Sequence, residues 1–153
     1  MQIKIEAKGI ENIQDVFNNL VNMGENTAPL MAELSNHLYN TSLYSFENEV
    51  SPDGIKWSPI QTRKNDPHPD KILYAQGTMQ DSLSSDSGKD YAAVGLNAVA
   101  DGYPYPIVHQ FGTLDGKIEA RAFMPIHEDG TIYENVLDQL EEISEDYLKS
   151  VLD

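Results

Sequence analysis

The segment that decides the fold is TIYENVLDQLEEISEDYLKSV, residues 131–151, which has the clearest periodicity in the chain. Its apolar side chains recur at the spacing of one helix face: Ile132, Val136, Leu140, Ile143, Tyr147 and Val151. Thr131 and Glu134 have the spacing of a capping box, in which hydroxyl and carboxylate satisfy free backbone N–H groups. Seven acidic residues between 134 and 153 occupy the other faces. The segment therefore predicts an amphipathic C-terminal helix.

The first fifty residues predict a short strand followed by two helices. Apolar and polar side chains alternate in residues 2–8, which is the period of a half-buried strand. The spacing then becomes helical, with Asn12 as the expected N-cap and Gly24 as the left-handed residue that ends the helix. A second helix is expected from its N-cap Thr27 to about Glu49.

The middle of the chain is rich in proline and in short elements. Four of the eight prolines lie in residues 51–70, and each removes a backbone donor and disfavours helix before it. We expect a long exposed loop there, anchored by Trp57. Strands are expected near residues 82–87, 91–97 and 119–126. The chain thus predicts one α+β domain over residues 1–153, a small, mostly antiparallel sheet packed against two N-terminal helices and a C-terminal helix.

The charge of the chain is strongly negative and unevenly distributed. The formal net charge is −15, with −4 in residues 1–75 and −11 in residues 76–153. Binding to a phosphate backbone requires clustered Lys and Arg, so this balance argues against nucleic-acid binding. The acidic surface is read either as a solvated face or as a face that repels DNA or meets a basic partner.

The sequence also restricts the compartment and the chemistry of the protein. It has no cysteine, which excludes disulfides and thiolate metal sites and suits the cytosol. The first residues lack the apolar run of a signal peptide, and no segment reaches the roughly 20 apolar residues that cross a bilayer. We therefore expect a soluble protein without a membrane partner.

The sequence contains no recognisable catalytic or metal-binding pattern. There is no phosphate-binding glycine loop and no Gly-x-Ser-x-Gly elbow. The four histidines share no metal-ligand spacing: His37, His68, His109 and His127. The acidic group Asp81, Asp86 and Asp90 lacks the spacing and the final Glu of a calcium loop. We expect no catalytic residue, no cofactor and no metal, and hence a protein that is not an enzyme.

Five sequence blocks are conspicuous but belong to no catalytic or metal-binding pattern. They are Phe46, Ser51-Pro-Asp-Gly-Ile-Lys-Trp57, Ile72-Leu73 with Gly77-Thr-Met-Gln-Asp-Ser-Leu83, Tyr105-Pro-Ile-Val-His-Gln-Phe-Gly112, and Ala120-Arg-Ala-Phe-Met-Pro125. In this order they resemble the phage virion morphogenesis family, the tail-completion proteins of Mu-like and related phages. The resemblance covers about residues 46–126. Pro106, Met79 and Ala122 depart from the Ala, Leu and Pro that family members typically have.

The motif residues are expected to build the fold or to join subunits. Trp57 should pin the turn before it, and His109 with Gln110 should satisfy buried backbone groups or bond across a subunit contact. The Arg121 fork has the shape to hold a carboxylate of a neighbouring subunit, and packing within one chain is the alternative for each residue. The candidate residues are Pro52, Asp53, Gly54, Trp57, Gly77, Tyr105, His109, Gln110, Phe111, Gly112, Arg121 and Phe123.

The resemblance implies a structural role in phage assembly. Such proteins act in tail completion and head–tail joining at the head-proximal end of the tail, as rings that are often hexameric. The implied partners are further copies of the chain, the tail tube protein and head connector proteins, first in the host cytoplasm and then in the virion. Two alternatives stay open: an acidic DNA mimic that inhibits a nucleic-acid-binding host protein, and a metal-assisted hydrolase.

Overall fold

The structure is a computed structural model that describes residues 4–60, 72, 78–97 and 105–153. Its elements in chain order are α1 (Glu11–Asn22), α2 (Ala28–Asn48), α3 (Thr78–Asp81), β1 (Ser84–Ser87), β2 (Ala92–Gly95), α4 (Tyr105–Phe111) and α5 (Glu134–Leu152). Helices and a small antiparallel sheet pack together, which confirms the predicted α+β class.

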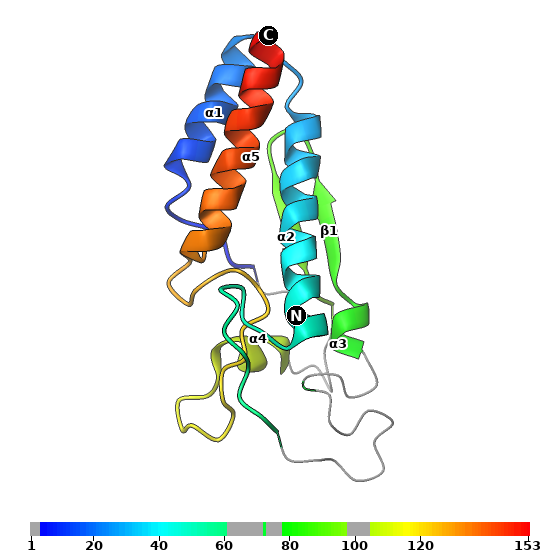
Figure 1. Ribbon diagram of the computed structural model, residues 1–153, viewed down its shortest axis with the longest axis vertical. Helices are drawn as coiled ribbons and strands as arrows, with labels where there is room; N and C mark the ends of the chain where they lie inside the picture. The colour runs from blue at the N-terminus through cyan, green and yellow to red at the C-terminus, as the bar shows by residue number, and fades with distance from the viewer. Residues whose placement is uncertain (1–3, 61–71, 73–77, 98–104) are drawn as a thin grey trace.

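Three long helices form the upper part of the molecule in Figure 1. α1 and α5 run in the same direction, α2 runs the opposite way, and α5 contacts both of the others. The strands β1 and β2 pair antiparallel, from Ser84 opposite Gly95 to Ser87 opposite Ala92, and lie along α2. α3 lies beside the lower end of α2, and α4 lies below the long helices (Figure 1).

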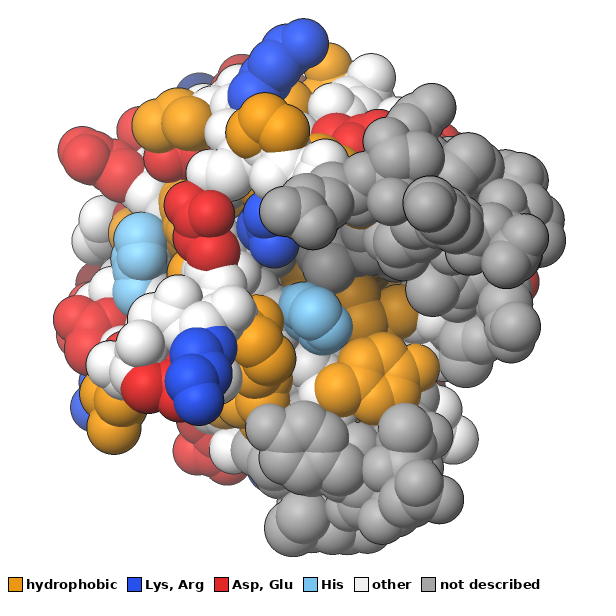
Figure 2. Space-filling view, turned by 90° about the horizontal axis from the view of Figure 1, so that it is seen from below, with side chains coloured by type: hydrophobic (Ala, Val, Ile, Leu, Met, Phe, Trp, Pro, Cys, Tyr) orange, Lys and Arg blue, Asp and Glu red, His pale blue; other side chains and the backbone are white. Residues whose placement is uncertain are grey.

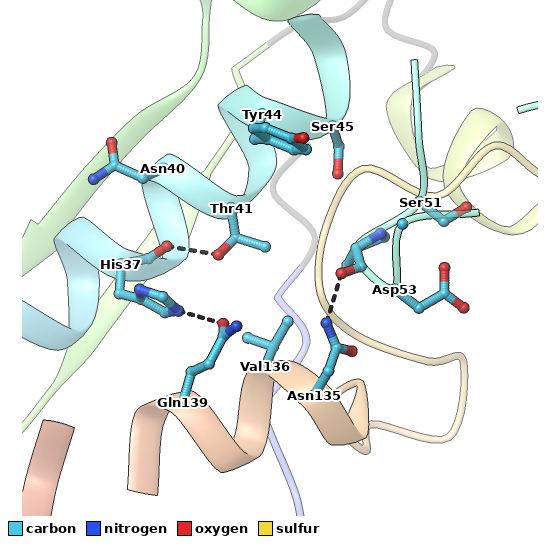
Figure 3. Close-up of a pocket in the computed structure, with 12 residues that line it drawn as sticks. His37, Asn40, Thr41, Tyr44, Ser45, Ser51, Asp53, Asn135, Val136 and Gln139 are labelled. Carbon is cyan, nitrogen blue, oxygen red and sulfur yellow. Dashed lines mark hydrogen bonds between the residues drawn. The ribbon is translucent and has the colours of Figure 1, made fainter. Parts of the chain in front are cut away.

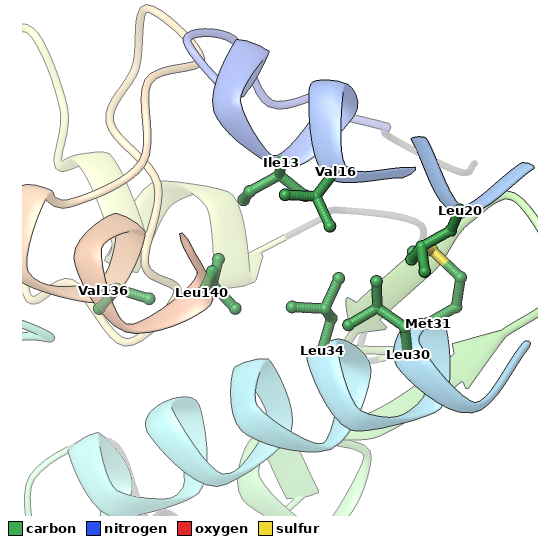
Figure 4. Packing of buried hydrophobic residues seen from close by; sticks show 8 residues of the cluster. All are labelled: Ile13, Val16, Leu20, Leu30, Met31, Leu34, Val136 and Leu140. Carbon is green, nitrogen blue, oxygen red and sulfur yellow. The ribbon is translucent and has the colours of Figure 1, made fainter. Parts of the chain in front are cut away.

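The upper core forms where the apolar faces of α1, α2 and α5, the three helices predicted from the sequence, pack together. Figure 4 shows side chains from α1, α2 and α5 pointing toward one another. Leu20 and Leu30 are fully buried at one end of it, near the turn that joins α1 and α2, and Val136 and Leu140 enter it from α5 (Figure 4). The remaining members are Ile13, Val16, Met31 and Leu34. Burial of these aliphatic groups supplies the main stabilisation of the bundle.

Gly24 ends α1 as predicted. Its φ of 75° is the left-handed conformation, which a residue without a Cβ adopts at little cost. The N–H of Gly24 donates to Val21 at 3.0 Å and that of Glu25 donates to Leu20 at 3.0 Å, the paired bonds of a Schellman cap. These bonds turn the chain toward α2.

The predicted N-caps are wrong in their chemistry. α1 begins at Glu11, so Asn12 lies inside the helix, where its amide donates to Glu141. Thr27 does precede α2, but its hydroxyl donates to the Lys89 carbonyl instead of capping the helix. Asn12 therefore bonds to a residue of α5, and Thr27 bonds to the turn between the strands. In both cases a tertiary contact replaces the expected local cap.

The capping box predicted at Thr131 is also wrong. α5 begins at Glu134 after Tyr133, and no side chain caps it. The Thr131 hydroxyl donates instead to the Asp129 carboxylate at 2.6 Å, and the Thr131 N–H donates to the same oxygen at 2.9 Å. Both bonds lower the pKa of Asp129 below its usual value. The Thr131 hydroxyl therefore bonds to the nearby Asp129 carboxylate and not to the start of α5, where the capping box was predicted.

Two of the predicted strands are wrong. Residues 4–7 are not a strand, and Lys8 makes only an isolated bridge to Thr131; residues 2 and 3 lie outside the described part. Residues 119–126 form no strand apart from an isolated bridge between Ile126 and Ile132. The strands predicted near 82–87 and 91–97 are present as the shorter β1 and β2. In residues 4–7, alternating side chains alone did not provide the segment with a strand partner.

Replacing Leu20 by Ala should lower the free energy of unfolding by about 3 kcal/mol, because it leaves a cavity among three helices. Val21, the next residue of α1, is 50% exposed, so Val21→Ala is the matched control and should change stability by less than about 0.5 kcal/mol. Urea unfolding followed by circular dichroism measures both. Equal losses in the two variants would contradict the helix packing described here.

Candidate functional site

The Pro-Asp-Gly motif forms a tight hairpin turn at the end of α2. The Gly54 N–H donates to Ser51 at 2.8 Å, the Ser51 N–H donates to Ile55 at 2.8 Å, and the Asp53 carboxylate accepts the Ile55 N–H. Gly54 has a φ of 88°, which favours glycine at the residue after such a turn. Pro52 is buried, and its carbonyl accepts the Asn135 amide of α5. The turn is therefore docked onto the bundle.

The long exposed loop predicted over residues 51–70 is therefore only partly correct. Residues 53–56 are exposed, but Pro52 and Trp57 are buried, so the first part of the segment is a packed hairpin. Residues 61–70 lie outside the described part of the chain.

Three aromatic residues from separate motif blocks form a second buried cluster. Phe46 stacks on Phe123 with ring centroids 4.8 Å apart, and it meets the edge of Trp57 at 6.2 Å. The Trp57 Nε1–H donates to the Ala122 carbonyl at 2.8 Å, so its polar group is satisfied inside the core. Ile72 and Met79 complete the buried set. Trp57 thus fixes the hairpin, in the way that the sequence led us to expect.

The buried side chain of Gln110 makes the backbone hydrogen bonds that a neighbouring strand would otherwise make. Its Oε1 accepts the N–H groups of Phe123 and Met124, both at 2.9 Å. Its Nε2 donates to the carbonyls of Met124 at 2.8 Å and Ile126 at 3.2 Å. These four bonds satisfy backbone groups of residues 119–126, called the extended segment below. This segment lies next to the end of α4 and has no neighbouring strand. The strand predicted at 119–126 does not form, and these side-chain bonds serve the second half of that segment.

Arg121 joins the hairpin region to the extended segment from the other side. Its side chain donates to the carbonyls of Ser58 at 3.0 Å and Pro59 at 3.2 Å. Its backbone N–H donates to His109 at 2.7 Å, and Glu119 lies 3.9 Å from its guanidinium. The described contacts of Arg121 are thus within the chain, and a contact with a neighbouring subunit stays a prediction.

Gly112 ends α4 where two segments come close together. It has a φ of 75°, and a Cβ there would lie 2.9 Å from the Ala120 nitrogen and 3.0 Å from the Ile118 oxygen. Both the conformation and the space require glycine. The block that ends in Gly112 is a helix, Tyr105–Phe111, so His109 and Gln110 are adjacent residues of a helix.

His109 lies against Tyr105, half-buried and with an unsatisfied ring nitrogen. The two rings meet edge to face with centroids 6.3 Å apart, and the buried His109 Nδ1 has no hydrogen-bond partner among the described residues. Burial lowers the pKa of His109 below its usual 6.5, and the Arg121 charge lowers this pKa further. Phe111, the last residue of α4, is half-buried. Gly77 lies outside the described residues.

A groove lies on the other side of the hairpin, between α2 and α5. It has a volume of about 370 Å³, and Figure 3 shows residues from the two helices and the turn facing one another across it. His37 of α2 and Gln139 of α5 are joined by a 2.8 Å hydrogen bond at one end. Asp53 and Asn135 lie at the other end. The turn residues of this groove were predicted from the sequence motif, whereas the residues of α2 and α5 that line it carry no sequence motif that marks them.

A second, smaller groove of about 260 Å³ lies beside Gln110 and Phe111, with His127, Glu128 and Tyr133 on its other wall. The His127 ring stacks on Tyr133 with centroids 4.1 Å apart. Within the described residues, no group of three His, Cys, Asp or Glu side chains is placed to hold a metal ion.

The two ends of the molecule differ in charge. In the three long helices Lys149 is the only basic residue, while the exposed face of α5 carries Glu134, Asp138, Glu142, Glu145 and Asp146. The opposite end, seen from below in Figure 2, mixes acidic, basic and hydrophobic side chains. No helix in the described part of the chain has the length and hydropathy needed to span a membrane.

The motif residues thus define an α+β domain in which separate sequence blocks meet in one packing and hydrogen-bonding centre. The chain belongs to the phage virion morphogenesis family, whose pattern it matches over residues 9–141. The match extends beyond the blocks at 46–126 and includes α1, α2 and the first part of α5. It confirms the family that the motifs suggested. Neither a curated protein nor a solved structure matched the chain.

Replacing Gln110 by Ala should lower the free energy of unfolding by about 3 kcal/mol, because buried backbone groups of the extended segment lose their partners. Gln14 is exposed on α1, so Gln14→Ala is the control and should be nearly neutral. Urea unfolding measures the difference. A neutral Gln110→Ala would show that the extended segment does not depend on this side chain.

The lowered pKa of His109 predicts a pH-dependent stability. The unfolded chain binds a proton near pH 6.5 and the folded chain only at lower pH, so the stability is complete above 6.5 and decreases as the pH falls below it. The variant His109→Gln removes this titration. Between about pH 7.5 and 5.5 the wild type should therefore lose more unfolding free energy than the variant. Parallel pH profiles would count against a neutral, buried His109.

Proposed function

We propose that this protein is a non-enzymatic tail-completion protein that closes the head-proximal end of a phage tail and joins it to the head. The observation that carries the proposal is the family match over residues 9–141. The use of the motif residues agrees with it, because Trp57, Gln110 and Arg121 make contacts that shape the fold.

We propose that the protein acts as a ring of identical subunits, with six as the number that the resemblance suggests. Its partners would be the tail tube protein on one side and head connector proteins on the other. A head-to-tail contact between copies closes into a ring when its rotation divides the full circle. Assembly would take place in the host cytoplasm and leave the ring in the virion.

Two exposed hydrophobic side chains support a role in contacts with other proteins. Ile55 and Leu114 lie on separate tight turns, and Leu114 is fully exposed. The Leu114 turn is held by bonds from Thr113 and Lys117 to the Asp115 carboxylate. An apolar group on a rigid turn costs little conformational entropy when it binds, so it suits a contact site.

We propose that the acidic helix faces line the channel of the ring. A channel lined by carboxylates repels the DNA that passes through it, and the long helices contain a single basic residue, Lys149, to offset their acids. The acidic surface would then aid DNA passage and would not imitate DNA.

The experiment that tests the proposal is a measurement of oligomeric mass, alone and with purified tail tubes that lack this protein. We expect a ring bound to one end of each tube in electron micrographs. A protein that stays monomeric in both conditions and leaves the tube ends bare would overturn the proposal. Recovery of a basic nuclease in place of tail tubes would favour the DNA-mimic alternative.

A pair of surface variants makes this test specific. Leu114→Ser should reduce binding to tube ends by about tenfold or more if this turn is a central contact. Leu152→Ser is the control, since Leu152 is also exposed but lies at the far end of α5 (Figure 1). The turn would be excluded as a contact if the two variants bind tube ends equally well.

A further inference from the structure

The N-terminal segment, residues 4–8, has the pattern of a strand but no sheet to join. It reads Lys-Ile-Glu-Ala-Lys, in which charged and apolar side chains alternate with the period of a half-buried strand. Within the described chain it is fixed at Lys8, whose N–H donates to the Gly130 carbonyl at 2.8 Å and which forms an isolated bridge to Thr131. Residues 4–7 form no strand, and Ile5 is 42% exposed. One copy of the chain thus leaves a segment with a strand pattern unpaired.

The small sheet has a free edge on β2. Figure 1 shows β1 and β2 along α2, with no third strand beside them in the described part of the chain. The Gly88 N–H donates to the Tyr91 carbonyl at 3.0 Å, so a hydrogen-bonded pair closes the hairpin. Bonded and non-bonded pairs alternate along an antiparallel ladder, so Ala92 and Val94 belong to non-bonded pairs. Their N–H and C=O groups therefore point away from β1.

The two edges of the sheet differ in how well they are protected against a further strand. At the edge of β1 the Ser87 N–H donates to the Asp86 carboxylate at 2.9 Å, so a side chain occupies a group that an added strand needs. β2 reads Ala-Ala-Val-Gly and has neither a charge nor a proline, the residues that usually block an edge. Its residues are half-buried or exposed, and no hydrogen bond from another described residue reaches the outward groups of Ala92 and Val94. The edge of β2 is therefore open to pairing.

The faces of the N-terminal segment and of β2 match. Ala92 packs against the upper core, so the side of β2 that carries Ala92 and Val94 faces the helices. Ala93, on the other side, is exposed. A strand added with Ile5 on the helix side covers that apolar side chain and leaves Glu6 on the exposed face beside Ala93. The four residues 4–7 also equal β2 in length.

Charge favours the same pairing. Residues 4–8 contain two lysines and one glutamate, a net charge of +1, whereas the whole chain carries −15. Asp86 lies opposite Ala93 on the exposed face of the sheet. The turn beside it adds Asp90 and Lys89, so the end of the sheet is negative by one unit of charge. A basic segment is therefore attracted to this end of the sheet.

We propose that residues 4–7 of one copy of the chain add as a third strand to the free edge of β2 in the next copy. Main-chain hydrogen bonds then provide the binding energy and the alternating side chains provide specificity. Lys8 stays bonded to Gly130 of its own chain and fixes the point from which the segment leaves. The contact joins two different surfaces, so it repeats head to tail and closes into a ring. This inference rests on the ring of identical subunits proposed above and names the surfaces that join them.

The absence of cysteine makes a disulfide a clean test of this contact. Glu6→Cys and Ala93→Cys place thiols on the exposed faces of the segment and of β2, where side chains of neighbouring strands lie within disulfide reach. The two variants are made in separate full-length chains, one of them labelled with ¹⁵N. They are mixed under oxidising conditions, alone and with purified tail tubes that lack the protein. A mixed dimer, detected by its mass, then forms only through a contact between copies.

We expect the mixed dimer to exceed that of a control mixture, Glu6→Cys with Ser84→Cys, by about fivefold or more. Ser84 is exposed on the same face of the sheet, but it lies on β1. Two strand spacings, roughly 10 Å, then separate it from the added segment, beyond disulfide reach. In chains without cysteine, Ile5→Asn should reduce the fraction of the protein in rings on tail tubes by about fivefold or more. Val21→Asn, at a 50% exposed position of α1, is the matched control.

The outcomes separate this contact from the assembly role. Rings on tail tubes that form without an excess of the mixed dimer would overturn the contact and leave the proposed function standing. A mixed dimer in a protein that never binds tail tubes would support the contact and count against the assembly role. A disulfide that forms only within a chain carrying both Glu6→Cys and Ala93→Cys would show that the segment pairs with its own sheet, and it would overturn the contact between copies. Equal loss of rings in Ile5→Asn and Val21→Asn would overturn it as well.

Discussion

The stacking of Phe46 on Phe123, with the edge of Trp57 against Phe46, is the contact on which the lower half of the molecule depends. These rings come from the end of α2, from the hairpin after it and from an extended segment about seventy residues later. The two later segments lack extensive regular pairing of their own. Burial of large aromatic surfaces supplies the stabilisation that a sheet would otherwise provide.

Hydrogen bonds from side chains make this irregular arrangement possible. A buried extended segment needs partners for its N–H and C=O groups, and Gln110 supplies four of them. Arg121 does the same for the carbonyls of Ser58 and Pro59, and Trp57 does so for Ala122. Because each of these residues is fixed by bonds within the chain, the spacing of the motif blocks describes how one subunit folds.

This use of the motif residues separates two parts of the surface. The motif residues with described contacts mostly build the interior of the lower half, whereas Ile55 and Leu114 are exposed on tight turns. The Pro-Asp-Gly turn belongs to both, since Pro52 docks on α5 while Asp53 and Gly54 are exposed. A single short motif thus forms a turn that is packed on one side and exposed on the other.

The sequence by itself determined the three long helices, the α+β class and the family, but not the short helices α3 and α4. Apolar residues at helical spacing located α1, α2 and α5, because a stripe of this kind has one stable way to be buried, and Gly24 marked the end of α1 because only local geometry is involved. Tertiary structure decided the rest. Asn12 and Thr27 found acceptors on distant parts of the chain and not at the helix starts that their positions suggested. Residues 119–126 bond to the side chain of Gln110 and not to a neighbouring strand. The groove lined by Ser45 lies between α2 and α5, which are distant in the sequence. A polar group bonds to whichever partner the packed fold brings nearest, and that partner cannot be read from its neighbours in the chain.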